Sequence, residues 1–198
     1  PWHLPLLDIL FAAGRVRRRR RRGAAPAITD IVAVAKAYSS CVGAGPFVTE
    51  WSGPRGDRLR RLGGDRGEYG ATTGRPRRVG PFDAVATRYG CRLQGASRVA
   101  LTNLDVLSYL DEIPVCTAYR VEGEETRTMP LTRYLEKAEP VFEHLPGWRG
   151  HDLTGARSWQ DLPAAARRYV ERVEALLETP IDMISVGPHR DALIYRNA

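Results

Sequence analysis

The order of apolar and polar positions along this chain is typical of strands that alternate with helices. A continuous apolar run of strand length at 31–35 predicts a strand buried on both faces, and the segments 98–102, 113–121 and 181–185 are further candidates for buried strands. Gly123 marks a predicted hairpin turn after the segment 113–121, and a further strand is expected at 125–129.

Two segments place apolar residues at helical spacing. The first predicts a helix that starts near Phe82, with Phe82, Val85, Ala86, Tyr89 and Leu93 at helical spacing. The second predicts a helix between Pro163 and Thr179, with an apolar face of Ala166, Tyr169, Val170, Val173, Leu176 and Leu177. The polar stretch 51–68 is expected to be a loop, and the small residues of 39–46 to form turns. Alternating strands and helices predict an α/β fold.

The positive charge of the chain is concentrated at its start. Residues 1–26 hold seven arginines and one acidic residue, so they carry +6 of the formal net charge of +7. Because the remaining residues are nearly neutral, a nucleic-acid-binding fold is disfavoured, and a binder built on the arginine tract is a minor alternative. We therefore divide the chain into 1–26, expected to be disordered or translated out of frame, and 27–198, a single globular region.

Cysteine content and hydropathy narrow the class of protein further. The three cysteines have no metal-ligand spacing, which predicts ordinary thiols in a reducing compartment and no metal site. No apolar run approaches the roughly 18 residues that a membrane span needs. We expect a cytoplasmic protein with no membrane partner.

Residues 70–78 form the most informative segment, Gly-Ala-Thr-Thr-Gly-Arg-Pro-Arg-Arg. Its hydroxyls and guanidinium groups are hydrogen-bond donors, and arginine matches carboxylates and phosphates with two parallel bonds. The segment therefore predicts a loop that binds an anion, through Ala71, Thr72, Thr73, Gly74, Arg75, Pro76 and Arg77. The alternative is a solvated basic loop.

Three further segments follow predicted strands, where α/β folds bind ligands. Asp105 can accept two parallel N–H bonds from the edge of a guanine ring, although it also suits a helix cap or turn. Backbone groups that can approach a flat base are offered by Ser185, Val186 and Gly187. Val42 and Gly43 can present backbone groups to a ribose. Ordinary turns are the alternative for the last two segments.

Six segments, taken in their order, carry a resemblance to a known family. They are VAKAYSSCVGAGPF (34–47), EYGATTGRPRR (68–78), FDAVA (82–86), LTNLDVL (101–107), LPGW (145–148) and ISVGP (184–188). Together they resemble the C-terminal part of adenylosuccinate synthetase, over about residues 28–196. The resemblance implies the C-terminal part of that family's P-loop-NTPase-like fold, a mixed sheet flanked by helices.

The resemblance also implies a function. The family is a cytoplasmic ligase of AMP biosynthesis that joins IMP and L-aspartate, using GTP and Mg²⁺, to give adenylosuccinate, GDP and phosphate. By resemblance, Thr72 and Thr73 donate to the aspartate carboxylates, Arg75 contacts aspartate and nucleotide, and Arg77 lies on the GTP side. The IMP ribose is implied to touch Val42 and Gly43, and the guanine to touch Asn103, Leu104, Asp105, Ser185, Val186 and Gly187.

Departures from the family pattern limit these expectations. Asn103 stands where the family usually has Lys, which removes a flat aliphatic stem and a charge beside the guanine. The phosphate loop, general base, catalytic His and Mg²⁺ ligands belong to the family's N-terminal half. We therefore expect no catalytic residue or metal ligand in this fragment, no activity of the fragment alone, and unpaired strand edges. A non-catalytic GTP- and aspartate-binding remnant is the alternative. The family is homodimeric.

Overall fold

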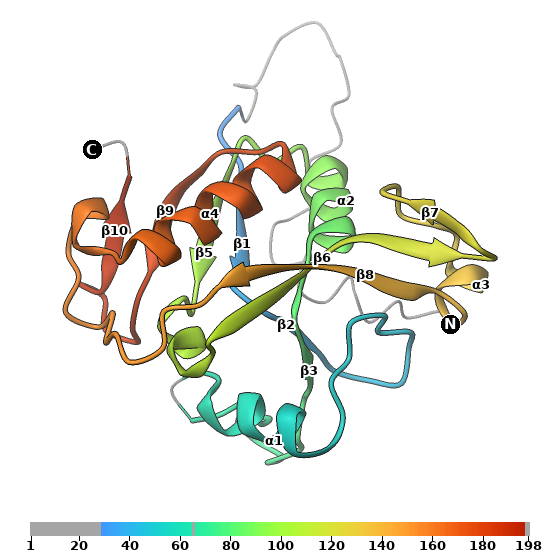
Figure 1. The fold of residues 1–198 in the computed structure, drawn as a ribbon, viewed down its shortest axis with the longest axis horizontal. Helices are drawn as coiled ribbons and strands as arrows, with labels where there is room; N and C mark the ends of the chain where they lie inside the picture. The colour runs from blue at the N-terminus through green and yellow to red at the C-terminus, as the bar shows by residue number, and fades with distance from the viewer. Residues whose placement is uncertain (1–28, 65, 197–198) are drawn as a thin grey trace, which may run out of the picture.

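The computed structural model describes residues 29–64 and 66–196, and the arginine-rich segment 1–26 lies outside them. One sheet has β1 (Val32–Lys36), β5 (Arg98–Thr102) and β9 (Ile181–Ser185) in parallel order, with β10 (Leu193–Tyr195) antiparallel to β9 (Figure 1). The strand candidates at 98–102 and 181–185 are confirmed as β5 and β9, and the apolar run at 31–35 predicted β1 within one residue.

A second sheet is built around the long strand β6 (Glu112–Val121). β6 pairs antiparallel with β7 (Glu124–Thr126) and β8 (Glu139–Pro146), and parallel with β4 (Phe82–Asp83). Gly123 occupies the predicted hairpin turn with a φ of +89°, a conformation that favours glycine. β7 is shorter than the strand predicted at 125–129, because the polar residues after Thr126 bury little surface.

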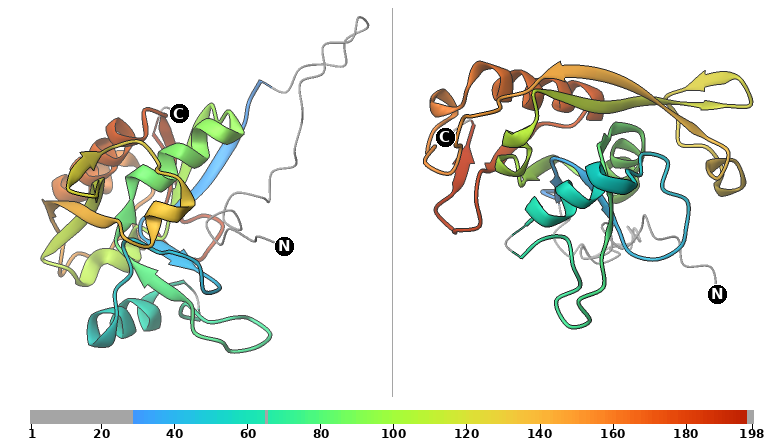
Figure 2. Two further views of the ribbon diagram at one scale, coloured as in Figure 1. Left: turned by 90° about the vertical axis from the view of Figure 1, so that its right-hand side faces the viewer. Right: turned by 60° about the horizontal axis from the view of Figure 1, so that its bottom comes forward.

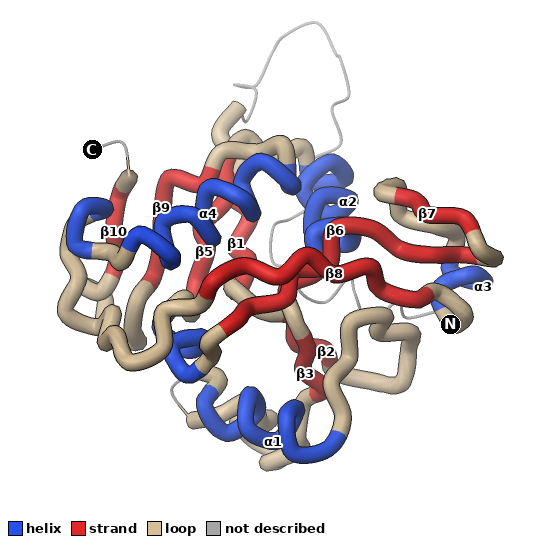
Figure 3. Tube along the Cα trace, in the orientation of Figure 1, coloured by secondary structure: helices blue, strands red, loops and turns tan. Residues whose placement is uncertain are grey.

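Helices α2 (Ala84–Gln94) and α4 (Ala164–Leu177) contact each other and lie between the two larger sheets (Figure 3). α4 confirms the predicted amphipathic helix, since its apolar face is buried. α2 begins two residues later than predicted, because Phe82 and Asp83 pair with β6 before the helix starts. A short helix α3 (Thr132–Leu135) precedes β8.

The stretch 51–68 contains a helix, so the prediction of a loop there was wrong. α1 (Gly53–Leu62) has Pro54 in its first turn and arginines in its last turn. The positive charges of these arginines interact favourably with the negative end of the helix dipole. Its buried residues are Gly56 and Leu59, which is too few to produce a recognisable apolar stripe. A Cβ at position 56 would lie 2.2 Å from the Trp51 carbonyl oxygen, so the close packing of this helix requires glycine.

The turns predicted at 39–46 begin later than expected, because β2 (Ser39–Cys41) occupies the first three residues. β2 pairs antiparallel with β3 (Arg78–Gly80), which follows the Thr-Thr-Gly-Arg loop directly. This two-stranded ladder therefore joins the segment of Val42 and Gly43 to the base of that loop.

The main core lies where α4 packs against the first sheet. Trp148 and Tyr169 are fully buried and meet edge to face, with 5.5 Å between ring centroids. The Tyr169 hydroxyl donates a 2.6 Å hydrogen bond to the Ala37 carbonyl, just past the end of β1. This contact fixes α4 over the end of the strand that leads into the candidate site.

Strand β1 forms the edge of its sheet within the described residues, as the resemblance led us to expect. Its only sheet neighbour there is β5, and the side chain of Val34 is 58% exposed. Exposed apolar residues on an unpaired edge strand are normally covered by another element.

Asp83 is a buried carboxylate that has no cationic partner among the described residues, and it joins α2 to the second sheet. It accepts hydrogen bonds from the Ala86 amide (3.0 Å) and from the Tyr119 hydroxyl (2.5 Å). Burial raises the pKa of Asp83 to about 6, against the opposing effect of these hydrogen bonds.

We expect Asp83 to make the stability of the chain depend on pH. Because its folded-state pKa is raised, its contribution is fully present below about pH 4 and is lost as the pH rises through 6. Asp83→Asn keeps a capping oxygen but cannot ionise. As the pH rises from 4 to 7, the free energy of unfolding of the variant should increase by roughly 2–3 kcal/mol relative to that of wild type. Urea unfolding at both pH values measures this difference, and a constant difference would contradict the prediction.

Candidate functional site

The Thr-Thr-Gly-Arg segment forms the tip of a hairpin between α1 and β3, and Figure 2 shows it extending away from the body of the protein. Tyr69 and Pro76 form an antiparallel bridge, and the Gly70 amide donates to the Arg75 carbonyl (2.8 Å). Gly74 turns the chain with a φ of +63°. All residues from 71 to 76 are exposed, so their donors are accessible to a ligand.

The three arginines of this hairpin have different surroundings. Arg75 is exposed, and its guanidinium has no recorded hydrogen bond or ion pair with any described residue. Arg77 donates to the buried carboxylate of Glu68 (3.0 Å). Arg78 is held by Glu50 (2.5 Å), and its guanidinium also donates to backbone carbonyls. Arg75 is therefore the arginine whose full set of donors is available to a ligand.

Arg78 fixes the turn that contains Val42 and Gly43. Its guanidinium donates to the carbonyl oxygens of Gly43 (3.2 Å) and Gly45 (2.6 Å). Val42 is exposed, and Gly43 has a φ of +100°. The predicted ribose-binding turn and the predicted anion-binding loop are thus tied together by one side chain at the loop's base.

The segments predicted to touch guanine lie at the carboxyl ends of neighbouring parallel strands. The Leu104 amide donates to the Ser185 carbonyl (3.1 Å), so Asn103, Leu104 and Asp105 lie beside Ser185, Val186 and Gly187. Asn103 has a φ of +61°, a conformation that asparagine tolerates better than most residues. A Cβ at position 187 would approach the Ala192 side chain to 3.3 Å.

Asp105 is half-buried and begins a short 3₁₀ helix at 105–109. Burial raises the pKa of its carboxyl, and the negative charge of Asp152 adds to the effect, while the amides of Asp105 and Val106 oppose it. Leu104 occupies the cap position of this helix, with no side-chain cap bond. The carboxylate is thus partly desolvated, and a ligand with paired N–H donors would satisfy it.

Sequence reasoning missed a charged cluster beneath the hairpin. Glu68 is 1% exposed and accepts hydrogen bonds from Lys36 (2.7 Å), Tyr38 (2.5 Å) and Arg77 (3.0 Å). Burial alone would raise the pKa of Glu68, but these hydrogen bonds hold it below its usual range. Lys36 lies 32 residues from Glu68 in the sequence, so no local pattern could have revealed the cluster.

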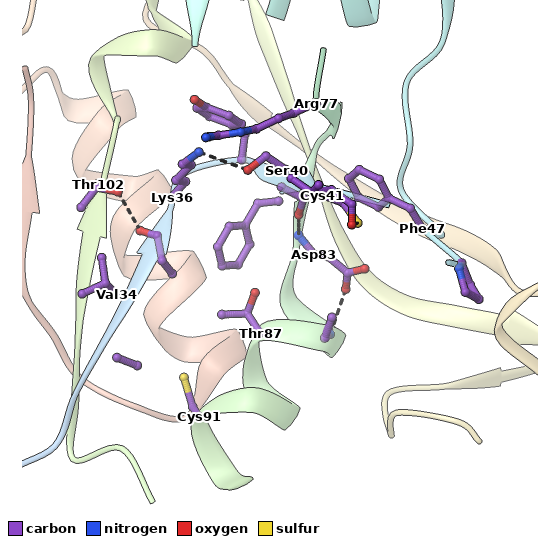
Figure 4. Close-up of a pocket in the computed structure, with 18 residues that line it drawn as sticks. Val34, Lys36, Ser40, Cys41, Phe47, Arg77, Asp83, Thr87, Cys91 and Thr102 are labelled. Atoms are coloured by element: carbon purple, nitrogen blue, oxygen red, sulfur yellow. Dashed lines mark hydrogen bonds between the residues drawn. The ribbon is translucent and has the colours of Figure 1, made fainter. Parts of the chain in front are cut away.

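A groove with a cavity volume of about 380 Å³ runs beside the edge strand β1. In Figure 4, Lys36, Ser40 and Arg77 gather at one end of it, and Thr87 and Cys91 lie towards the other. The Lys36 ammonium donates to the Ser40 hydroxyl (3.1 Å). The groove therefore has a cationic end that faces the hairpin and a largely apolar body along β1 and α2.

Other candidate chemistry is sparse in the described part of the chain. Among those residues, no group of three or more His, Cys, Asp and Glu side chains is placed to hold a metal ion. The three cysteines are buried and form no disulfide. No described helix has both the length and the apolar content to cross a membrane.

Comparison with known proteins gives a consistent family. The protein-family model for adenylosuccinate synthetase matches residues 20–194. The adenylosuccinate synthetase of Trichlorobacter lovleyi is 52% identical over 165 residues, which are 83% of this chain and 37% of that protein. The enzyme of Acidothermus cellulolyticus is 51% identical over 173 residues, 86% of this chain and 40% of that protein.

A solved structure shows the same fold. A fully ligated adenylosuccinate synthetase from Plasmodium falciparum superimposes with a TM-score of 0.78 at 37% identity, over 84% of this chain and 39% of that one. This chain thus spans about two fifths of the length of the relatives it matches.

Proposed function

Because this chain belongs to the adenylosuccinate synthetase family, we propose that it carries the C-terminal part of that enzyme. The complete enzyme would join IMP and L-aspartate, using GTP, to give adenylosuccinate, GDP and phosphate. In this proposal, residues 27–198 bind aspartate, one side of IMP and the guanine of GTP. The remaining three fifths of the family's length would supply the rest of the catalytic site.

The observation that carries this proposal is the meeting of two sequence segments at adjacent strand ends. Asp105 and Ser185 are 80 residues apart in the sequence, and the bond from Leu104 to Ser185 joins their segments. A carboxylate at this position can accept both N–H donors of a guanine edge, whereas adenine presents no such pair. The site would therefore select GTP over ATP.

The hairpin would bind aspartate. Thr72 and Thr73 would donate to its carboxylates, and Arg75 would form a charged pair with aspartate while reaching the nucleotide. Val42 and Gly43 would contact the IMP ribose from the turn that Arg78 holds. Arg77 would face GTP from the cationic end of the groove.

The edge of β1 supports the view that this chain is part of a larger fold. Among the residues that the structure describes, β1 has one sheet neighbour, Val34 is exposed on it, and the groove beside it has largely apolar walls. A further strand of the enzyme would pair with this edge and cover the apolar body of the groove, leaving its cationic end open. GTP would be used as its magnesium complex, but the described residues form no magnesium site, so no step through the metal is assigned to them.

Amide hydrogen exchange tests these site assignments. The chain is mixed with the remaining portion of a relative's enzyme, and each substrate is added separately. Aspartate should slow exchange at 70–77, and GTP should slow exchange at 103–105 and 185–187. Protection that is the same for both substrates, or that lies outside these segments, would contradict the assignments.

A further inference from the structure

We propose that Glu68 is a positioning residue that presents Arg77 and Lys36 together as a binding site for a phosphate oxygen. This inference rests on the proposed function, since the phosphate would belong to the nucleotide. It adds Lys36 to the residues that contact ligand, and it assigns a role to the buried carboxylate of Glu68 beside the hairpin.

The two oxygens of Glu68 hold cations from different elements. Oε1 accepts from the Lys36 ammonium (2.7 Å) on β1 and from the Tyr38 hydroxyl (2.5 Å). Oε2 accepts from one nitrogen of the Arg77 guanidinium (3.0 Å) at the end of the hairpin. One carboxylate therefore fixes two positive groups that lie 41 residues apart in the sequence.

The backbone around Glu68 makes this arrangement rigid. The Glu68 amide donates to the Arg60 carbonyl (2.7 Å), and the Arg77 amide donates to the Glu68 carbonyl (2.9 Å). The Arg60 side chain in turn donates to the Arg77 carbonyl (2.8 Å). A Cβ at Gly63 would lie 2.6 Å from the Glu68 side chain, so the end of α1 packs closely against it. Groups held this firmly bind a ligand with little loss of freedom.

The charges and exposure of the cluster fit an anion. Two cations share one carboxylate, which leaves one positive charge. The side chains of Lys36 and Arg77 remain 29% and 34% exposed and line the groove (Figure 4). The side chain of Glu68 is only 1% exposed. The guanidinium has five N–H donors, of which Glu68 engages one nitrogen, and the Ser40 hydroxyl adds a further polar group. A phosphate oxygen suits these donors, while a cation would be repelled.

Glu68→Gln and Lys36→Met test the proposal. The first removes the charge that holds Arg77 but preserves shape, and the second removes a partly exposed cation. In the chain combined with the remaining portion of a relative's enzyme, each variant should raise KM for GTP about ten- to a hundred-fold. KM for aspartate should stay nearly unchanged. Glu68→Asp should restore part of the affinity, because it keeps the charge.

A second measurement does not depend on turnover. Inorganic tripolyphosphate is titrated into the chain by calorimetry, and both variants should bind it about ten-fold more weakly than wild type. Glu143→Gln is the matched control, since it removes a carboxylate that pairs with Arg172 away from the hairpin. If Glu68→Gln fails to fold, Lys36→Met decides the outcome alone.

The outcomes separate this proposal from the proposed function. Unchanged tripolyphosphate affinity in Lys36→Met, or a GTP KM equal to that of wild type, would overturn the phosphate site even if the enzyme is active. Absence of adenylosuccinate in wild type, with tripolyphosphate binding weakened in both variants, would count against the proposed function and leave the phosphate site supported.

Discussion

Replacing Arg75 with alanine is expected to raise KM for aspartate about a hundred-fold or more in the assembled enzyme. Arg75 lies at the exposed tip of the hairpin, and none of its guanidinium donors is occupied by a described residue. Each charged hydrogen bond that it forms with a carboxylate is worth about 1.5–3 kcal/mol. Two parallel bonds therefore account for an effect of this size.

The fold should be unaffected by this substitution, because the exposed side chain makes no hydrogen bond or ion pair with a described residue. Arg61→Ala is the matched control, since Arg61 is also exposed and lies at the end of α1, in the element before the hairpin. Steady-state kinetics with aspartate as the varied substrate provide the measurement. Equal KM values for Arg75→Ala and Arg61→Ala would show that the hairpin does not bind aspartate.

Replacing Asp105 with asparagine is expected to weaken GTP binding about a hundred- to a thousand-fold, because two charged hydrogen bonds to the guanine edge are lost. An asparagine amide offers one acceptor and one pair of donors, so it fits a base with one N–H and one carbonyl at this edge. Xanthine has that pattern. The variant should therefore bind xanthosine triphosphate more tightly than GTP, reversing the preference of wild type.

This reversal distinguishes a changed base preference from misfolding of the variant. A variant that is only misfolded loses both nucleotides, whereas a changed hydrogen-bond pattern exchanges one for the other. Asp111→Asn serves as control, since Asp111 is an exposed carboxylate a few residues away, paired with Arg149. Competition binding of the two nucleotides measures the ratio. A ratio that is the same in Asp105→Asn and wild type would exclude Asp105 from guanine recognition.

The main strands could be predicted from sequence because each is a short segment rich in apolar residues. β5 and β9 match the predicted ranges, and the buried face of α4 matches the predicted stripe. α1 could not be predicted in this way. It buries one large side chain, Leu59, and its position depends on a close backbone approach at Gly56, which is a tertiary contact.

The candidate site shows the same division. The Thr-Thr-Gly-Arg segment and Asp105 were recognisable because their chemistry is local, within a few consecutive residues. The different surroundings of Arg75 and Arg77 were not, since they depend on Glu68 and on its contacts with β1. All arginines in one loop carry the same hydrogen-bond donors. Which of them is already paired depends on the tertiary structure.

The most direct test of the central claim is product formation by the assembled enzyme. The chain is combined with the remaining portion of a relative's adenylosuccinate synthetase, and adenylosuccinate is measured by mass spectrometry with IMP, aspartate and GTP present. We expect product that depends on this chain and on all three substrates, with ATP failing to replace GTP. A folded, assembled complex that forms no adenylosuccinate, or that uses ATP equally well, would contradict the account.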